Sequence, residues 1–254
     1  MLLYHGTAGI DYQQILNEGL KPRGKRKGNW KHSALSNANA VYLSRCYAPH
    51  FMMTAGQHLR EPPTTGLLIE VESDRLGYYQ LLPDEDCLEQ VMRGHDEVKG
   101  TQRARTLWYR NNLRNYVGAG ANGVAFWEMS VRQLGNCCYY GAIPPSAITR
   151  IAVVDLAKHP RLRFDFDLSV VLANHRIMGD TYHWRTRCLF GDERPDDGKE
   201  DEFHSWQIAC TDVHVMHMGR FGEPVGSQKV TREAAPPKGW AKLVALEKQE
   251  RSAA

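Results

Sequence analysis

Short apolar runs separated by polar or glycine-containing segments organise the first 155 residues. Besides the N-terminal run Met1-Leu-Leu-Tyr4, strands are predicted at 41–43, 67–71, 123–127, 137–140 and 148–154. Apolar positions at helical spacing predict helices at 10–18, 47–59, 85–93 and 101–116. Strands mixed with inserted helices in this way predict an α+β fold.

The pattern changes after Asp155. Two helices are predicted at 168–177 and 182–190, followed by an acidic loop at 191–202 and a charged helix at 240–251. We therefore divide the chain into a first domain, 1–158, and a C-terminal extension, 159–254. The extension is expected to be helical, packed on the core, and to end in a polar tail.

Composition narrows the class of protein. The chain has 254 residues and a mean hydropathy of −0.50, and no apolar stretch approaches membrane-spanning length. We expect a cytoplasmic protein that does not enter the membrane. The six cysteines show no Cys-x-x-Cys spacing, and His214 and His217 have no third ligand nearby, so we expect reduced thiols and no metal.

Two strand ends carry the residues with candidate chemistry. The consecutive residues His5, Gly6 and Thr7 lie at the end of the first strand, and the run 40–44 ends with Tyr42 and Ser44 close together. A histidine can hydrogen-bond a sugar hydroxyl, and a glycine allows a flat ligand to approach the backbone. Because a helix and a basic loop accompany these two strand ends, we predict that they form one site.

The order of five short motifs within residues 1–155 resembles the ADP-ribosyltransferase superfamily, especially bacterial enzymes that modify nucleic acid and the RNA 2′-phosphotransferases. The motifs are Tyr4-His5-Gly6-Thr7, Ile15 to Pro22, Val41-Tyr42-Leu43-Ser44, Gly66 to Glu72 and Ala142 to Ile148. The resemblance implies a split mixed sheet with inserted helices and a C-terminal helical extension, and a catalytic domain over 1–158.

The resemblance also implies NAD as the co-substrate. By this resemblance His5 hydrogen-bonds the adenosine-side ribose, the Gly6 backbone pairs with the nicotinamide amide, and Tyr42 stacks on the nicotinamide ring. Thr7 and Ser44 are then secondary donors. Cleavage of the bond between ribose and nicotinamide develops positive charge on the sugar, so the site has to stabilise that charge in the transition state.

This chain departs from the family pattern at the third catalytic position, which is usually a glutamate. The slot falls on or near Asn136, which cannot take a proton, and the nearest carboxylate is Glu128. Both residues remain candidates for this catalytic position.

Basic residues cluster between the two strand ends. The loop contains Arg23, Lys25, Arg26, Lys27, Trp30 and Lys31. A second basic set with aromatic residues runs through the predicted helix 101–116. Cations interleaved with flat rings suit single-stranded nucleic acid, although a solvated helix face is the plainer interpretation of the second set.

We therefore predict an NAD-dependent ADP-ribosyltransferase that modifies nucleic acid, with RNA favoured over single-stranded DNA. The resemblance further implies a toxin of a toxin–antitoxin or anti-phage system, similar to the mRNA-modifying toxins of toxin–antitoxin–chaperone systems, with an antitoxin protein as partner. The alternatives are a protein ADP-ribosyltransferase and a non-catalytic nucleic-acid-binding module. A 2′-phosphotransferase is disfavoured because that family uses arginines where this chain has Tyr42.

Overall fold

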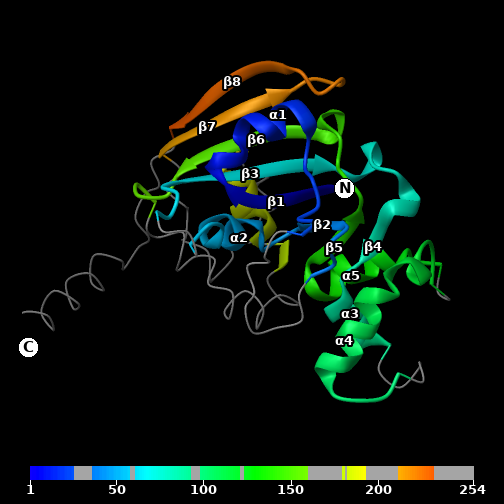
Figure 1. Ribbon diagram of the computed structural model, residues 1–254. Helices are drawn as coiled ribbons and strands as arrows, with labels where there is room; N and C mark the ends of the chain where they lie inside the picture. Colours follow the sequence, from blue (N-terminus) through cyan, green and yellow to red (C-terminus); the bar gives the residue numbers. More distant parts are fainter. Residues whose placement is uncertain are drawn as a thin grey trace, which may run out of the picture.

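The computed structural model describes residues 1–25, 36–57, 61–92, 98–120, 123–159, 179–180, 182–192 and 211–231. Its centre is a sheet of eight strands in the order β4-β5-β2-β1-β3-β6-β7-β8, antiparallel at each described pairing (Figure 1). The strands are β1 Leu2–Ala8, β2 Ala40–Ser44, β3 Thr65–Glu72, β4 Leu81–Pro83, β5 Asn136–Tyr140, β6 Ile148–Asp155, β7 Thr211–Met218 and β8 Pro224–Thr231.

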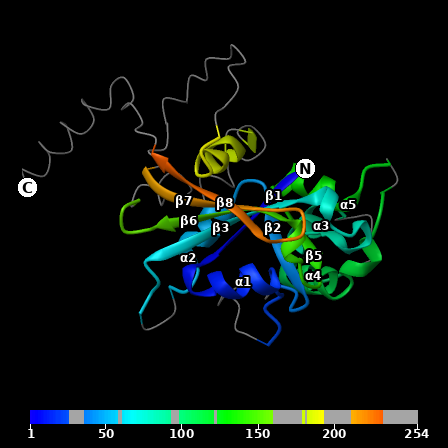
Figure 2. The same cartoon turned by 90° about the horizontal axis from the view of Figure 1, so that it is seen from above.

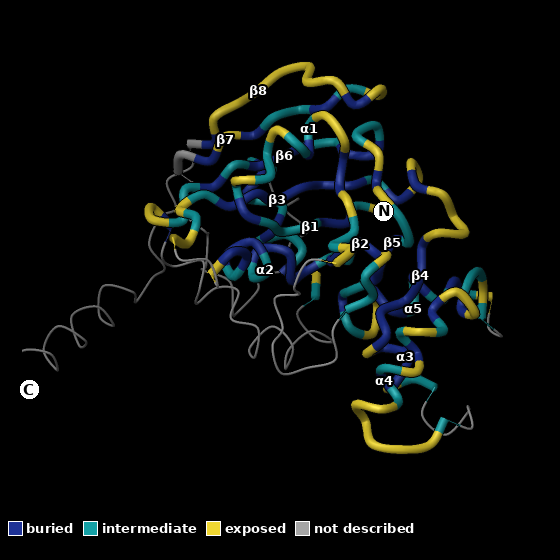
Figure 3. Tube along the Cα trace, viewed as in Figure 1, coloured by how far each residue is buried: buried dark blue, intermediate teal, exposed yellow. Residues whose placement is uncertain are grey.

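Both faces of the central strands are covered. In β3, residues 66–71 are all buried, which explains why this segment is apolar in the sequence except at Glu70. Burial falls toward the β8 edge, where residues 224–229 are exposed (Figure 3). The core therefore lies over β1, β3 and β6.

The described helices are short and lie around this sheet. The α-helices are α1 Tyr12–Glu18, α2 Ala48–Thr54, α3 Glu85–Val91, α4 Gln102–Asn111 and α5 Phe126–Leu134. The 3-10 helices are η1 Gly9–Asp11, η2 Ser73–Arg75, η3 Tyr78–Gln80, η4 Leu113–Tyr116 and η5 Pro145–Ala147. Helix α1 covers one face, while the helical residues 182–188 cover the other (Figure 2). The buried residues of α2 pack in the same cluster as Tyr182 and Phe190. Helices α3, α4 and α5 gather beside β4 and β5.

Local signals explain where several helices begin and end. Asp84 caps α3 by accepting a hydrogen bond from the Asp86 backbone, and Thr101 caps α4 in the same way through Ala104. Helix α5 ends at Gly135, whose φ of 75° is the left-handed conformation that glycine adopts without strain. This turn leads directly into β5.

The structure confirms the α+β class and corrects some details. We expected a mixed sheet. The sheet is instead antiparallel at each described pairing. The run 123–127 was expected to be a strand, but α5 begins at Phe126, because Trp127 and Val131 bury one helical face.

The C-terminal extension includes structure that we did not predict. The segments β7 and β8 add two strands to the sheet, so the described part of the extension is not purely helical. The predicted helices at 168–177 and 240–251 lie outside the described residues, and the division at residue 158 stays a prediction. Within the described ranges, no helix combines the length and the apolar character needed to cross a membrane.

Candidate active site

The strands β1 and β2 separate at the candidate site. Strand β1 pairs with β3 at seven positions, but with β2 only at Tyr4 and Ser44. Beyond this pair, the ring Nδ1 of His5 lies 2.9 Å from the backbone oxygen of Tyr42. A side chain thus connects the strands where ladder hydrogen bonds would otherwise continue.

The bond to Tyr42 sets the tautomer of His5. A carbonyl oxygen can only accept a hydrogen bond, so Nδ1 carries the proton and donates. Burial lowers the pKa of His5, although the Tyr42 bond and the charge of Asp11 favour the protonated ring. The neutral ring then has a lone pair on Nε2, and no described residue hydrogen-bonds that atom. His5 can therefore accept a hydrogen bond from a ligand hydroxyl.

His5 and Tyr42 do not meet through their side chains. Tyr4, Ser44 and Asn136 are paired across three strands and share one face, and Tyr42 shares it because it lies two residues before Ser44. Because side chains alternate along β1, the side chain of His5 projects from the opposite face of the sheet to that of Tyr4. A ligand contacting both side chains would have to lie across the separation of β1 and β2.

Gly6 is required by packing. A Cβ at this position would overlap the backbone oxygen of Ala48 and lie 2.5 Å from the backbone nitrogen of Met52. Because the first turns of α2 occupy that side of the backbone, the glycine lets α2 lie directly on β1. The expected approach of a ligand to Gly6 is therefore limited to its other sides.

The hydroxyl of Tyr42 is already engaged. It donates to both carboxylate oxygens of Glu85, at 2.8 and 2.7 Å, and accepts a hydrogen bond of 2.7 Å from the backbone of Asn37. Its half-buried ring packs against a cluster that includes Leu88 and Tyr109. Tyr42 can offer a ligand the exposed part of its ring, while its hydroxyl holds Glu85.

Glu85 is a site residue that the sequence did not reveal. It is 5% exposed and lies in the first turn of α3. Burial raises the pKa of Glu85 to about 7, although the hydrogen bond from Tyr42 favours the ionised form. In the sequence, Asp84-Glu85 is an ordinary pair of acids at a helix start, so only its burial marks it.

The raised pKa of Glu85 predicts a pH dependence of stability. The folded state binds this proton more tightly than the unfolded chain, whose value is about 4.5, so the free energy of unfolding falls as pH rises from about 4.5 to 7. At 1.36 kcal/mol per pKa unit, the loss is about 3 kcal/mol at most. Glu85→Gln keeps an acceptor for Tyr42 and should remove this part of the slope.

Thermal unfolding between pH 4.5 and 8 measures the effect. The exposed Glu61→Gln variant is the matched control and should keep the slope of the parent. An unchanged slope in Glu85→Gln would mean that Glu85 titrates near its ordinary value.

The two hydroxyl residues make internal contacts. Ser44 is buried; it accepts from the backbones of Cys46 and Tyr47, at 3.0 and 2.6 Å, and donates to the Gly135 oxygen at 3.1 Å. These bonds fix the turn between β2 and α2. The hydroxyl of half-buried Thr7 lies 3.4 Å from a carboxylate oxygen of Asp11.

The two candidates for the third position lie in different places. Asn136 begins β5 opposite Ser44, and its buried Oδ1 has no hydrogen-bond partner among the described residues. Glu128 lies in the first turn of α5, 3.7 Å from Arg132. Asn136 is in strand register with the point where β1 and β2 separate, whereas Glu128 is on a helix beside the sheet.

Substitution separates these two candidates. If Asn136 holds the third position, Asn136→Ala should reduce transfer of ADP-ribose by about 10²-fold, because a preorganised polar contact is lost, and Glu128→Gln should be nearly silent. The opposite order would place Glu128 in the site. Two fully active variants would show that neither residue takes part in the reaction.

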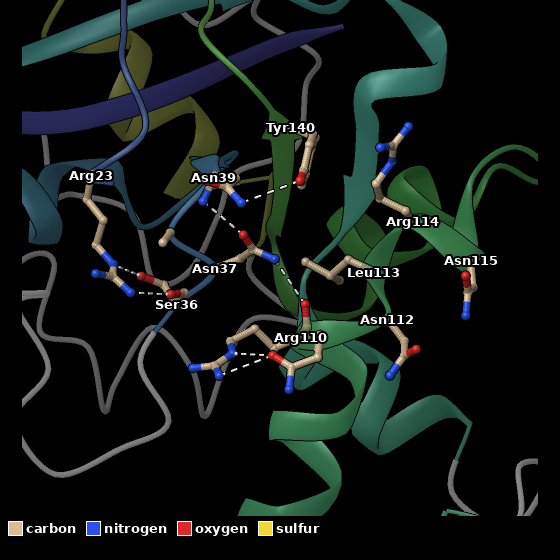
Figure 4. A pocket seen from close by; sticks show the side chains of 12 residues that line it. Arg23, Ser36, Asn37, Asn39, Arg110, Asn112, Leu113, Arg114, Asn115 and Tyr140 are labelled. Atoms are coloured by element: carbon tan, nitrogen blue, oxygen red, sulfur yellow. Dashed lines mark hydrogen bonds between the residues drawn. The ribbon is translucent and has the colours of Figure 1, made fainter. Parts of the chain in front are cut away.

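A basic cleft lies beside Tyr42 (Figure 4). Its volume is about 420 Å³. The lining residues are Arg23, Ser36, Asn37, Ala38, Asn39, Arg110, Asn111, Asn112, Leu113, Arg114, Asn115 and Tyr140. Asn37 connects the cleft to the site, because its backbone donates to Tyr42 and its amide donates to the Arg110 oxygen at 3.0 Å.

The cleft brings together parts of the two basic segments. Arg23 comes from the loop, and Arg110 and Arg114 come from the end of α4 and from η4. Lys25 is exposed outside the lining. The other predicted nucleic-acid contacts, Arg26, Lys27, Trp30 and Lys31, lie outside the described residues.

The rest of α4 is mainly structural. Arg105 pairs with the buried carboxylate of Glu89, and Tyr109 is buried in the core beside β4 and β5. Trp108 remains 40% exposed. Only the C-terminal end of α4 therefore contributes cations to the cleft.

Comparison with known proteins gives a weak structural likeness. No protein-family model and no curated protein matches the chain. A nicked CARDS toxin matches with a TM-score of 0.35 and 11% identity, over 61% of this chain and 25% of that chain. EcPltA matches with a TM-score of 0.34 and 7% identity, over 60% of this chain and 74% of that chain. A mutant of the E. coli heat-labile enterotoxin matches with a TM-score of 0.29 and 13% identity, over 61% of this chain and 69% of that chain. TM-scores this low carry no statement about activity or substrate.

Proposed function

We propose that the protein is an NAD-dependent ADP-ribosyltransferase that modifies nucleic acid, with RNA favoured over DNA. The observation that carries the proposal is the neutral His5 ring at the separation of β1 and β2. Its Nδ1 is fixed by Tyr42, so the lone pair of Nε2 has a defined orientation and can accept a hydrogen bond from a ligand hydroxyl. This is the contact that a ribose hydroxyl of NAD requires.

The residues present fit NAD in part. His5 supplies the acceptor for the ribose, and Tyr42 supplies part of a ring face. Bound NAD supplies an ADP-ribosyl group attached to a good leaving group. In the transfer, the bond between the ribose C1′ and the nicotinamide nitrogen breaks, and its electron pair leaves with neutral nicotinamide. A bond forms between C1′ and an oxygen or nitrogen of the target, which releases one proton to a base or to water.

The cleft supports a nucleic-acid target. It presents three arginines and, among its described lining residues, no carboxylate, and Asn37 connects it to Tyr42. Phosphates need cations of this kind. A role as a toxin, held in check by an antitoxin protein, belongs to the same proposal and rests on the sequence resemblance.

The first alternative keeps the NAD-dependent transfer of ADP-ribose but has a protein as the target. A non-catalytic nucleic-acid-binding module is the second alternative, and the absence of a carboxylate at Asn136 favours it. In that case the cleft would bind RNA while NAD stays intact.

Transfer of label identifies the target. The protein is incubated with NAD labelled in the adenylate part and with single-stranded RNA, single-stranded DNA or a mixture of cellular proteins. We expect label on RNA, and less on DNA. Label on proteins alone would establish the first alternative, and no label on any acceptor would favour the second.

A further inference from the structure

The basic cleft carries an inference about how a target would be held. The described lining residues include three arginines and five asparagines but no aspartate or glutamate. Arginine supplies positive charge, and an asparagine amide both donates and accepts hydrogen bonds. This chemistry suits a ligand that has phosphates and also polar, flat edges.

Neighbouring groups hold two of the arginines at the wall of the cleft. Arg23 donates to the Ser36 backbone oxygen at 2.7 Å, and Arg110 donates to the Asn111 amide oxygen at 3.3 and 3.2 Å. These acceptors orient the guanidinium groups at the wall of the cleft, and the charge of Arg110 also acts on the buried carboxyl of Glu85. Figure 4 shows both groups on the same side of the cleft.

The third arginine belongs to a stacking surface. The guanidinium carbon of Arg114 lies 5.2 Å from the ring centre of Tyr140, and the amide of Asn39 donates to the Tyr140 hydroxyl at 3.4 Å. Tyr140 is half-buried and Arg114 is exposed. A cation over an aromatic ring forms a flat surface on which an unpaired base can stack.

We propose that this cleft binds single-stranded nucleic acid, with phosphates at Arg23 and Arg110 and one unpaired base against Arg114 and Tyr140. The volume of about 420 Å³ suits a nucleotide-sized part of a chain. A duplex keeps its bases stacked inside and cannot insert one without unpairing it. An acidic protein would need the cations but not the flat surface or the five amides.

The cleft also explains how a target could reach the reactive site. Asn37 lines the cleft, and its backbone donates to the hydroxyl of Tyr42, whose own backbone oxygen binds His5. A strand held in the cleft therefore lies next to Tyr42, one of the residues proposed to bind NAD. This step rests on the proposed function, but binding in the cleft can be measured without NAD.

The test is the binding of a short fluorescent single-stranded RNA by the full chain, without NAD, at several salt concentrations. In the cleft variant, Arg23, Arg110 and Arg114 are each replaced by glutamine. The matched control carries Arg75→Gln, Lys158→Gln and Arg220→Gln, which remove the same charge outside the cleft. We expect the cleft variant to bind at least about tenfold more weakly and to lose about two units of the salt slope, while the control stays close to the parent.

Tyr140→Leu tests the stacking surface separately, because it keeps an apolar side chain and all the charges. We expect it to weaken binding of single-stranded RNA by about tenfold and to leave the salt slope unchanged. Thermal unfolding shows whether each variant keeps the stability of the parent. If Tyr140→Leu is less stable, Arg114→Lys replaces it, since it keeps the charge but loses the flat group.

Three results would overturn the proposal. They are equal weakening in the cleft variant and the control, binding of duplex RNA as tight as that of single strands, and displacement of RNA by an acidic peptide as effectively as by unlabelled RNA. Failure of the cleft is distinguishable from failure of the enzyme. RNA binding without nicotinamide release would leave the cleft in place and refute the transferase, whereas nicotinamide release without RNA binding would do the reverse.

Discussion

Replacing His5 with alanine is expected to reduce transfer of ADP-ribose by at least about 10²-fold and to leave the fold intact. The reason is that Nε2 is an acceptor held in a fixed orientation at the separation of β1 and β2, and losing one preorganised hydrogen bond of this kind typically has an effect of that size. Tyr42→Ala should also abolish transfer, because it removes the ring face. Initial rates of label transfer to RNA measure both variants.

Two controls make the result specific. His214→Ala removes an exposed histidine on β7, outside the site, and should keep the activity of the parent. Tyr42→Phe keeps the ring and loses the bond to Glu85, so it separates the ring face from the hydroxyl. Full activity of the His5→Ala variant would refute the site assignment.

Arg150→Ala is expected to cause the largest loss of stability. Arg150 on β6 donates to the almost fully buried Glu70 and to Asp192, and Thr149 also donates to Glu70. Its guanidinium also lies 4.7 Å from the ring centre of Phe190. Without Arg150 the carboxylate of Glu70 is buried unpaired, and breaking a buried pair in this way costs about 3–5 kcal/mol. Denaturant unfolding measures the loss.

A second variant separates unpaired charge from lost packing. In Arg150→Met with Glu70→Gln, both charges are removed and the volume is largely kept, so stability should recover a large part of the loss. If the double variant is no more stable than Arg150→Ala, packing and not the buried charge explains the effect.

The sequence predicted the strands of the core well, and the physical reason is clear. Segments such as 67–69 are buried on both faces and form continuous apolar runs. The edge strand β8 could not be predicted in this way, because residues 224–229 are exposed on both faces and show no alternation. Strand β7 did carry a signal that we did not use, since buried Val213 and Val215 alternate with exposed His214.

The sequence motifs located the candidate site, but the contacts that each residue makes in the fold could not be read from them. Ser44 and Gly6 looked like ligand contacts, yet Ser44 fixes a turn and Gly6 makes room for α2. Glu85 carried no motif, because its pKa is raised mainly by burial, which the sequence does not show, and further by the charge of Asp86. The cleft joins residues from distant segments, so only the fold could show that Arg23 and Arg110 share it.

The most direct test of the central claim is the release of nicotinamide from NAD by the full chain, with and without single-stranded RNA. The parent should release nicotinamide in the presence of RNA, in amounts equal to the ADP-ribose found on the RNA, and the His5→Ala variant should release almost none. Intact NAD in all mixtures, with RNA still bound by the parent, would contradict the account and leave a nucleic-acid-binding module.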